Sequence, residues 1–316
     1  MFYYLIKPFV PRRIQITMRR KYVKLRLKKY KEIWPIDERI YREPRGWRGW
    51  PDGKKFALIL THDVETGKGQ DRCNDLIKLE ESLNLRSSFN FVPERYRVDS
   101  NLRTILGSKG FEVGVHGLNH DGKLFKSKSI FSRRAEKINT YLEEWNSVGF
   151  RAPAMHHNLK WVHELDILYD ASTFDCDPFE AQPDGVETIF PLWVAGADGG
   201  GYVELPYTLP QDFTLFVLMQ EKSIDTWIKK LDWIAEKGGM ALVITHPDYM
   251  CFGGKRPGYE EYPASLYKAF LSYVSVKYEG QFWHRVPRDV ASWFSNTIRA
   301  QKLSDESTDI SIGQKL

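Results

Sequence analysis

The stretch FALILTHD, residues 56–63, is a nearly unbroken apolar run that ends in polar side chains. Such a run is typical of a strand that is buried on both faces, as in parallel sheets. Similar runs recur at SSFNFVP (87–93), FEVGVHG (111–117) and MALVITHP (240–247), with helical spacing between them. This alternation predicts parallel strands joined by crossover helices, and hence an α/β barrel or a doubly wound sheet.

Polar residues stand at the carboxyl ends of four predicted strands, namely Asp63, His116, Arg151 and His246. In a barrel these ends meet on one rim, where active sites are built. These residues therefore favour an α/β barrel over a doubly wound sheet, and we expect the barrel to occupy residues 51–302 as one unit.

Composition excludes several classes of protein. The 316 residues are 42% apolar and 14% aromatic, which is enough for a sizeable core and excludes wholesale disorder. The three cysteines show no CxxC spacing, which argues against a disulfide framework or a cysteine zinc site and fits a reducing compartment. The apolar start of the chain is broken by Lys7 and Pro8, so we expect no signal peptide and a cytoplasmic location.

Residues 1–50 form a basic N-terminal arm with 15 Lys and Arg against 4 Asp and Glu, whereas the other 266 residues carry 31 against 37. Apolar and basic residues interleave over 14–30, which predicts a helix. This helix could lie on an anionic membrane surface, at the inner face of the membrane, or could pack as a solvated helix against the body. Nucleic acid is not an expected partner, because no nucleic-acid motif is present. The polar tail, 303–316, is expected to be disordered.

Two motifs offer metal ligands. Asp63 and Glu65 are two residues apart, so in an extended chain both carboxylates point to the same side. One could bind a metal while the other takes a proton from water, or Asp63 could instead cap the following turn. His116 and His120, in HGLNH, could bring two imidazoles onto one metal or be two unrelated loop histidines. Two histidines and one acid leave open positions on the metal and suit zinc or another divalent transition metal.

Two further strand ends offer acid–base chemistry. Arg151, in FRAP (150–153), can hold a carboxylate by a bidentate pair and keep it ionised, with Pro153 stiffening the turn, or can form a surface salt bridge. His246, in LVITHP, can titrate near neutrality and protonate a leaving amine, or can be a satisfied core histidine. Amide cleavage needs such an acid, because an amine anion is a very poor leaving group.

The ordered series THDVE, HGLNH, FRAP, YDASTFDCDP and LVITHP, over roughly residues 54–250, resembles the five motifs of polysaccharide deacetylases. This is the NodB-homology group, whose fold chitin and peptidoglycan deacetylases share. The resemblance implies a distorted barrel of about seven strands and a metal held by one acid and two histidines. It further implies that Asp63 is the base, that Arg151 orients it and that His246 is the general acid. Residues that match the fourth motif, together with one from the third, would line the substrate groove: Asp170, Ser172, Phe174 and Pro153.

The first motif departs from the family pattern, which has two adjacent aspartates where this chain has Asp63-Val64-Glu65. Similarity to variants with an acid-x-acid spacing indicates that Glu65 joins His116 and His120 as a metal ligand. The alternative is that Asp63 binds the metal directly.

The resemblance therefore implies a hydrolase that depends on a divalent metal, zinc first and cobalt, nickel or manganese as alternatives. Its substrate would be an N-acetylated or N-formylated amino sugar, as a nucleotide- or lipid-linked intermediate of surface polysaccharide synthesis. One alternative is hydrolysis of another non-peptide C–N bond, in a ureide or formamide. The other is a non-catalytic carbohydrate-binding module, against which the retention of all six site residues argues.

Overall fold

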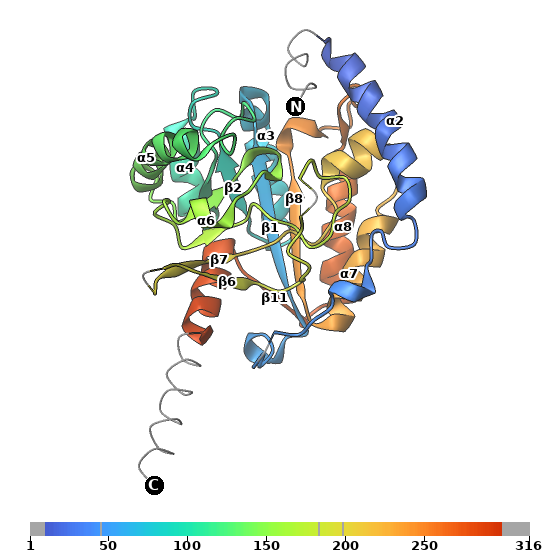
Figure 1. Cartoon of the computed structure of the whole chain (residues 1–316). Coiled ribbons are helices and arrows are strands. Elements are labelled where there is room, and N and C mark those ends of the chain that lie inside the picture. Colours follow the sequence, from blue (N-terminus) through green and yellow to red (C-terminus); the bar gives the residue numbers. More distant parts are fainter. Residues whose placement is uncertain (1–9, 45, 183, 198, 299–316) are drawn as a thin grey trace.

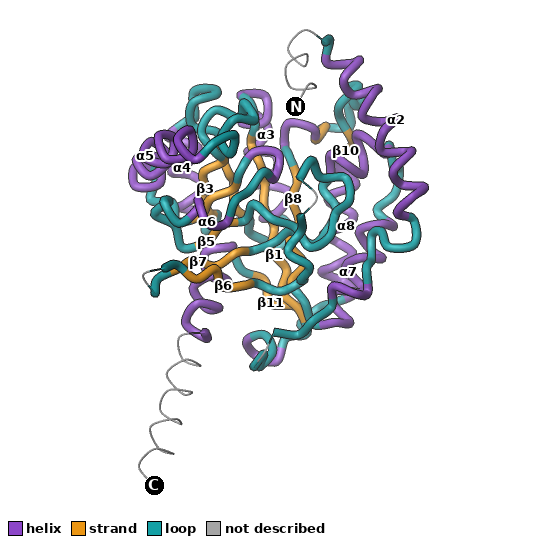
Figure 2. Tube along the Cα trace, in the orientation of Figure 1, coloured by secondary structure: helices purple, strands orange, loops and turns teal. Residues whose placement is uncertain are grey.

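Strand β1 (Phe56–Val64) runs through the middle of a curled sheet in the computed structural model, and all nine of its residues are buried. The structure describes residues 10–44, 46–182, 184–197 and 199–298. Helices surround the sheet, as Figures 1 and 2 show. A strand covered on both faces must be apolar along both faces, which explains the unbroken run that begins at Phe56.

Seven parallel strands follow one another across the sheet in the order β8, β1, β2, β3, β4, β5 and β7. Their bounds, besides β1, are β2 Ser88–Phe91, β3 Glu112–His116, β4 Gly149–Arg151, β5 Tyr169–Asp170, β7 Gly201–Glu204 and β8 Met240–Thr245. Beyond β7, the N–H groups of Thr208 and Leu209 each donate to the Leu242 carbonyl at 3.2 Å, which brings that side back toward β8. The curled, mostly parallel sheet confirms the predicted distorted (β/α) barrel.

Smaller strands complete the sheet. Strand β6 (Leu192–Ala195) pairs antiparallel with β7, and β11 (Phe282–His284) pairs parallel with the first residues of β1. A separate pair, β9 (Met250–Cys251) and β10 (Tyr262–Pro263), lies beyond the end of β8.

The helices that surround the sheet are α2 Arg12–Tyr30, α3 Gly67–Glu81, α4 Ser100–Ser108, α5 Lys128–Glu144, α6 Leu159–Val162, α7 Asp225–Lys237 and α8 Ala264–Lys277. A π-helical segment, η5 (Phe213–Met219), precedes α7, and a last helix covers residues 287–298 of the described chain. Side-chain caps start α3 and α5, where Thr66 accepts from the Gly69 N–H and Ser127 accepts from the Ile130 N–H.

Successive residues of β1 belong to two different core layers. Phe56, Leu58 and Leu60 pack against the surrounding helices, whereas Ala57 and Ile59 pack in the barrel interior. Because side chains alternate along a strand, odd-numbered residues of β1 face the interior and even-numbered residues face the helices. This alternation decides which polar residues at the end of β1 can reach the rim of the barrel.

The basic arm contains the predicted helix as α2, which runs along the outside of the molecule (Figure 1). Its Ile16 and Val23 are buried against the body, so one face of the helix is packed. Within the described residues, no helix combines the length and apolar character needed to cross a bilayer. The predicted disordered tail, 303–316, lies outside the described residues.

Candidate active site

The end of β1 delivers two carboxylates to the barrel rim. Asp63 and Glu65 share the odd-numbered, interior side of the strand, and Asp63 is 3% exposed. The neighbouring His62 points to the helix side, where its Nε2 lies 2.8 Å from Glu80 and its Nδ1 lies 2.7 Å from Thr245 Oγ1. His62 is therefore a core histidine, although it stands inside the first motif.

Three potential metal ligands converge above the end of β1: Glu65, His116 and His120 each offer one ligand atom, and these atoms all lie within 4.8 Å of one another. Glu65 Oε1 is 3.0 Å from His120 Nε2, and the two imidazole centroids are 5.2 Å apart. Burial opposes ionisation of Glu65, but His120, with smaller contributions from His246 and His116, holds the pKa of Glu65 well below its usual range. The two histidines of HGLNH are thus brought together with Glu65.

The turn between the two histidines depends on a close approach. Gly117 has φ +61°, and a Cβ on it would lie 2.5 Å from Pro153 Cδ. Only glycine fits both the backbone conformation and the space. His120 itself has φ +54°, an uncommon conformation that bends the chain so that its ring returns toward His116.

The donor set fits a divalent transition metal. His116 Nδ1 lies 3.1 Å from the Arg151 carbonyl and donates to it, which leaves Nε2 as the electron-pair donor. Burial lowers the pKa of His116 to about 4, so its ring is neutral at pH 7, as ligation requires. His120 Nε2 is buried and faces the Glu65 carboxylate at 3.0 Å. A set of one carboxylate and two imidazoles suits zinc and its neighbours in the first transition row.

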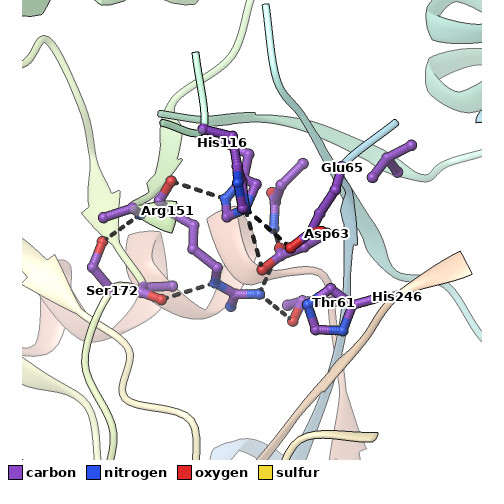
Figure 3. Close-up of polar contacts among 12 residues, drawn as sticks. Thr61, Asp63, Glu65, His116, Arg151, Ser172 and His246 are labelled. Atoms are coloured by element: carbon purple, nitrogen blue, oxygen red, sulfur yellow. Dashed lines mark hydrogen bonds and ion pairs between the residues drawn. The ribbon is translucent and has the colours of Figure 1, made fainter. Parts of the chain in front are cut away.

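Asp63 lies beside this cluster and is held by two donors. Asn90 Nδ2 and Arg151 Nη1 donate to its Oδ1 at 3.0 and 3.1 Å, while Oδ2 faces His116 Nε2 at 3.9 Å (Figure 3). Burial favours protonation, but the Arg151 charge, the two histidines and the Asn90 hydrogen bond together outweigh it and bring the pKa of Asp63 to about 2. Asp63 is therefore a carboxylate at neutral pH, with one oxygen left toward the cluster.

Arg151 is 1% exposed, so it is no surface residue. It reaches Asp63 through Nη1 alone, because its Nε donates to the Ala171 carbonyl at 2.8 Å and Nη1 is shared with Thr61. The expected bidentate pair is thus replaced by a single contact within a wider network (Figure 3).

His246 follows β8 and is paired with an acid. Its Nδ1 lies 2.7 Å from Asp212 Oδ1, and its backbone N–H donates to Asp212 Oδ2 at 2.8 Å. Burial alone would lower the pKa of His246, but the Asp212 carboxylate, with the charges of Glu65 and Asp63, raises it to about 10. The imidazolium form is favoured at neutral pH, and because Nδ1 is engaged, its available proton lies on Nε2.

The residues expected to line the substrate groove divide into two groups. Asp170, Ser172 and Phe174 are fully buried. Ser172 donates to Asp170 and accepts from the Ala152 N–H at 2.8 Å, so it braces the segment that follows Arg151. Pro153, in contrast, lines a small surface hollow together with His120. Substrate contact by the three buried residues stays a prediction.

Four residues that contact the site are absent from the sequence-based expectations. Asn90 binds Asp63, and Asp212 binds His246. The Tyr249 hydroxyl donates to Glu65 Oε2 at 3.1 Å, and Asp248 accepts from the Glu65 N–H at 2.9 Å. The end of β2 and the HPDY sequence could have indicated Asn90, Asp248 and Tyr249, whereas no local pattern marks Asp212.

Comparisons with known proteins found similarity in fold but not in sequence. No family model matches the sequence, and no curated protein matches it either. A protein provisionally described as a polysaccharide deacetylase from Mycobacterium smegmatis superposes with TM-score 0.57 at 22% identity, over 80% of this chain and 93% of its own. A second so described, from Pseudomonas aeruginosa PAO1, gives 0.58 at 17% identity, over 77% and 92%. The chain has the polysaccharide-deacetylase fold.

The same fold also matches the Puue allantoinase, with TM-score 0.60 at 17% identity, over 82% of this chain and 96% of the allantoinase. At these identities the polysaccharide-deacetylase fold is what the chains have in common. Function must therefore be argued from the site.

Proposed function

We propose that this protein is a metal-dependent amide hydrolase that removes an acetyl or formyl group from the nitrogen of an amino sugar. The observation that carries the proposal is the juxtaposition of three ligand atoms within 4.8 Å with two oppositely tuned groups, the carboxylate Asp63 and the imidazolium His246. Pairs of titratable groups whose pKa values are driven apart mark acid and base assignments in active sites.

Glu65, His116 and His120 would hold the metal. A divalent ion at such a site supplies Lewis acidity toward the amide carbonyl and lowers the pKa of water. Among the metals, zinc fits this ligand set best, with cobalt, nickel and manganese as alternatives.

Asp63 acts as the acceptor for the water proton. Arg151 and Asn90 occupy Oδ1, so the free lone pairs are those of Oδ2, on the side of His116. The Arg151 charge keeps Asp63 ionised between catalytic cycles, and the fixed carboxylate orients water at no rotational cost.

His246 acts as the donor for the departing nitrogen. Asp212 fixes the ring orientation and tautomer through Nδ1 and stabilises its positive charge. A proton on Nε2 can then pass to the amine as the C–N bond breaks, which avoids release of an amine anion.

The amino-sugar substrate rests on the shared fold with proteins described as polysaccharide deacetylases. A nucleotide- or lipid-linked intermediate of surface polysaccharide synthesis is the form we favour. The match to an allantoinase favours one second candidate, hydrolysis of a C–N bond in a ureide or similar small amide.

A reconstitution experiment tests the proposal. Purified protein is stripped with chelator, titrated with zinc, cobalt, nickel and manganese, and assayed for acetate or formate release from N-acylated hexosamines, their nucleotide-linked forms, allantoin and formamides. We expect release from an N-acylated sugar that depends on added metal and is lost in the double variant His116→Ala, His120→Ala. His163→Ala, which removes an exposed histidine, is the matched control. Full activity in the double variant would refute the mechanism, and cleavage of allantoin alone would select the second candidate.

A further inference from the structure

Helix α2 is fixed to the body through one face only. Ile16 is fully buried and Val23 is 3% exposed, and both lie on this inner face. Arg20 adds two hydrogen bonds, from Nε to the Val217 carbonyl at 2.9 Å and from Nη2 to the Tyr259 carbonyl at 2.8 Å. The position of α2 against η5 and the loop at Tyr259 is therefore set by packing and by hydrogen bonds.

The opposite face of α2 carries an exposed apolar stripe, which consists of Ile14, Met18, Tyr22 and Leu25. These side chains are 51%, 57%, 52% and 69% exposed. Their spacing of four, four and three residues places them in one row along the helix. Four large apolar side chains in a row on one short surface element need a partner, because isolated exposed apolar residues are ordinary but contiguous ones are not.

The apolar stripe is surrounded by positive charge. Helix α2 contains nine Lys and Arg residues and no Asp or Glu. Lys21, Lys24 and Lys28 are exposed along one side of the stripe. The remainder of the chain has the opposite sign, since the residues outside α2 carry 37 Lys and Arg against 41 Asp and Glu. Net positive charge is thus concentrated in this helix.

We propose that the outer face of α2 docks on an anionic lipid bilayer, with the apolar stripe in the headgroup layer and the lysines on lipid headgroups. Helices that lie in the plane of a membrane combine an apolar row with flanking Lys and Arg in this way. Nucleic acid would use the charges but leave the apolar stripe in water, which makes it the poorer fit.

Docking through α2 would also orient the site. The Arg12 Nε lies 2.8 Å from Glu260 Oε2, and α2 begins on the side of the molecule where β1 and β8 end (Figure 1). The Arg19 guanidinium lies over the Phe213 ring at 4.8 Å, and that ring packs on Tyr249, which hydrogen-bonds Glu65. The bilayer would therefore lie beside the barrel rim, and if the proposed function holds, a lipid-linked amino sugar becomes the favoured substrate.

Vesicle sedimentation with the full chain tests the docking. Vesicles of phosphatidylcholine alone are compared with vesicles that contain about one third phosphatidylglycerol, at low and high salt. We expect binding only to the anionic vesicles, weakened by salt, and at least ten-fold weaker for Met18→Ser, Leu25→Ser. Val276→Ser on α8 is the matched control, because Val276 is 79% exposed but lies outside the stripe, and its binding should not change.

Equal thermal unfolding of all variants would show that the substitutions leave the fold intact, as expected for exposed positions. Failure of the wild-type protein to bind anionic vesicles would overturn the proposal, as would unchanged binding by Met18→Ser, Leu25→Ser. Self-association that is lost in this variant, without vesicle binding, would also overturn it and assign the stripe to a second copy of the chain. The assay involves no catalysis, so its result is independent of the proposed hydrolase activity.

Discussion

Replacement of Asp212 by Asn should convert His246 from an imidazolium to a neutral ring at pH 7. The Asp212 carboxylate is fully buried and accepts hydrogen bonds from His246 Nδ1 and N, from the Tyr262 hydroxyl at 2.9 Å and from the Phe213 N–H at 2.7 Å. The asparagine side chain has a similar shape, but it has one acceptor oxygen in place of two and carries no charge. Burial, which disfavours the charged ring, then lowers the pKa of His246, and only the charges of Glu65 and Asp63 still raise it.

The size of the effect follows from the shift. Asp212 and the other acids raise the pKa of His246 from 6.5 to about 10 against burial. A shift of this size corresponds to about 5 kcal/mol in favour of the imidazolium in the folded state. The folded-state pKa lies above the unfolded one, so this stabilisation is complete below about pH 6.5 and is lost as the pH rises through about 10. Loss of one partner from a buried pair costs about 3–5 kcal/mol, so Asp212→Asn should be strongly destabilised at pH 6 and much less so above pH 10.

Two measurements on metal-free protein check this reasoning. Ring ¹⁵N shifts of labelled histidines give the pKa of His246, and urea unfolding at pH 6 and above pH 10 gives the free energy of unfolding. Tyr262→Phe, which removes one hydrogen bond but keeps the Asp212 charge, should leave the pKa of His246 high. A pKa of His246 above 9 in Asp212→Asn would refute the argument. Catalytic turnover by Asp212→Asn should fall by about 10²- to 10⁴-fold at pH 7.5, the usual contribution of a general acid.

Three further predictions concern residues around the site and beneath it. Glu65→Gln should weaken zinc binding, measured by calorimetry, by more than about 100-fold. Groups that only support the ligands already contribute about 10- to 100-fold to metal affinity, and a direct ligand should contribute more. Unchanged affinity would assign the ligand to Asp63. Burial raises the pKa of Glu112 from 4.5 to about 7, so the protein should lose about 3 kcal/mol of stability as the pH rises between these values. Urea unfolding at pH 5 and pH 8 measures this loss, and Glu112→Gln should abolish it. Gly114→Ala would place a Cβ 2.0 Å from Asn90 Oδ1 and should cost about 1–3 kcal/mol of unfolding free energy, whereas Gly107→Ala, which meets nothing within 4 Å, should be neutral or stabilising.

The sequence was sufficient to predict the barrel and the residues at its rim, because both depend on local patterns. The apolar run of β1 reflects burial on two faces, and parallel strands bring Asp63, His116 and His246 to a common edge. The resemblance between motifs assigned roles to these residues, and in the structure the three expected ligands, Glu65, His116 and His120, lie within reach of one another.

Partners that come from distant parts of the chain could not be predicted in this way. Asp212 lies 34 residues before His246, and its contact depends on how η5 packs beside the end of β8. The burial of Ser172 could not be predicted either, since a polar side chain at a strand end can line a substrate groove or can hydrogen-bond a neighbouring segment inside the protein. Only the hydrogen bond from the Ala152 N–H to Ser172 in the folded structure distinguishes these two roles.

The spacing of the two acids explains how one strand can supply a base and a ligand. Adjacent residues on β1 point to opposite faces, as His62 shows by its contact with Glu80 on the helix side. A second acid two residues after Asp63 stays on the interior side and lies one step further out, where the longer Glu65 side chain reaches His120. Arg151 and Asn90 hold Asp63 at Oδ1, which leaves only Oδ2, at 3.9 Å from His116 Nε2. Among the described residues, the ligand atoms that all lie within 4.8 Å of one another are those of Glu65, His116 and His120, and Asp63 is not in that group. The fixed contacts of Asp63, rather than the identity of the acid at position 65, thus favour Glu65 as the ligand.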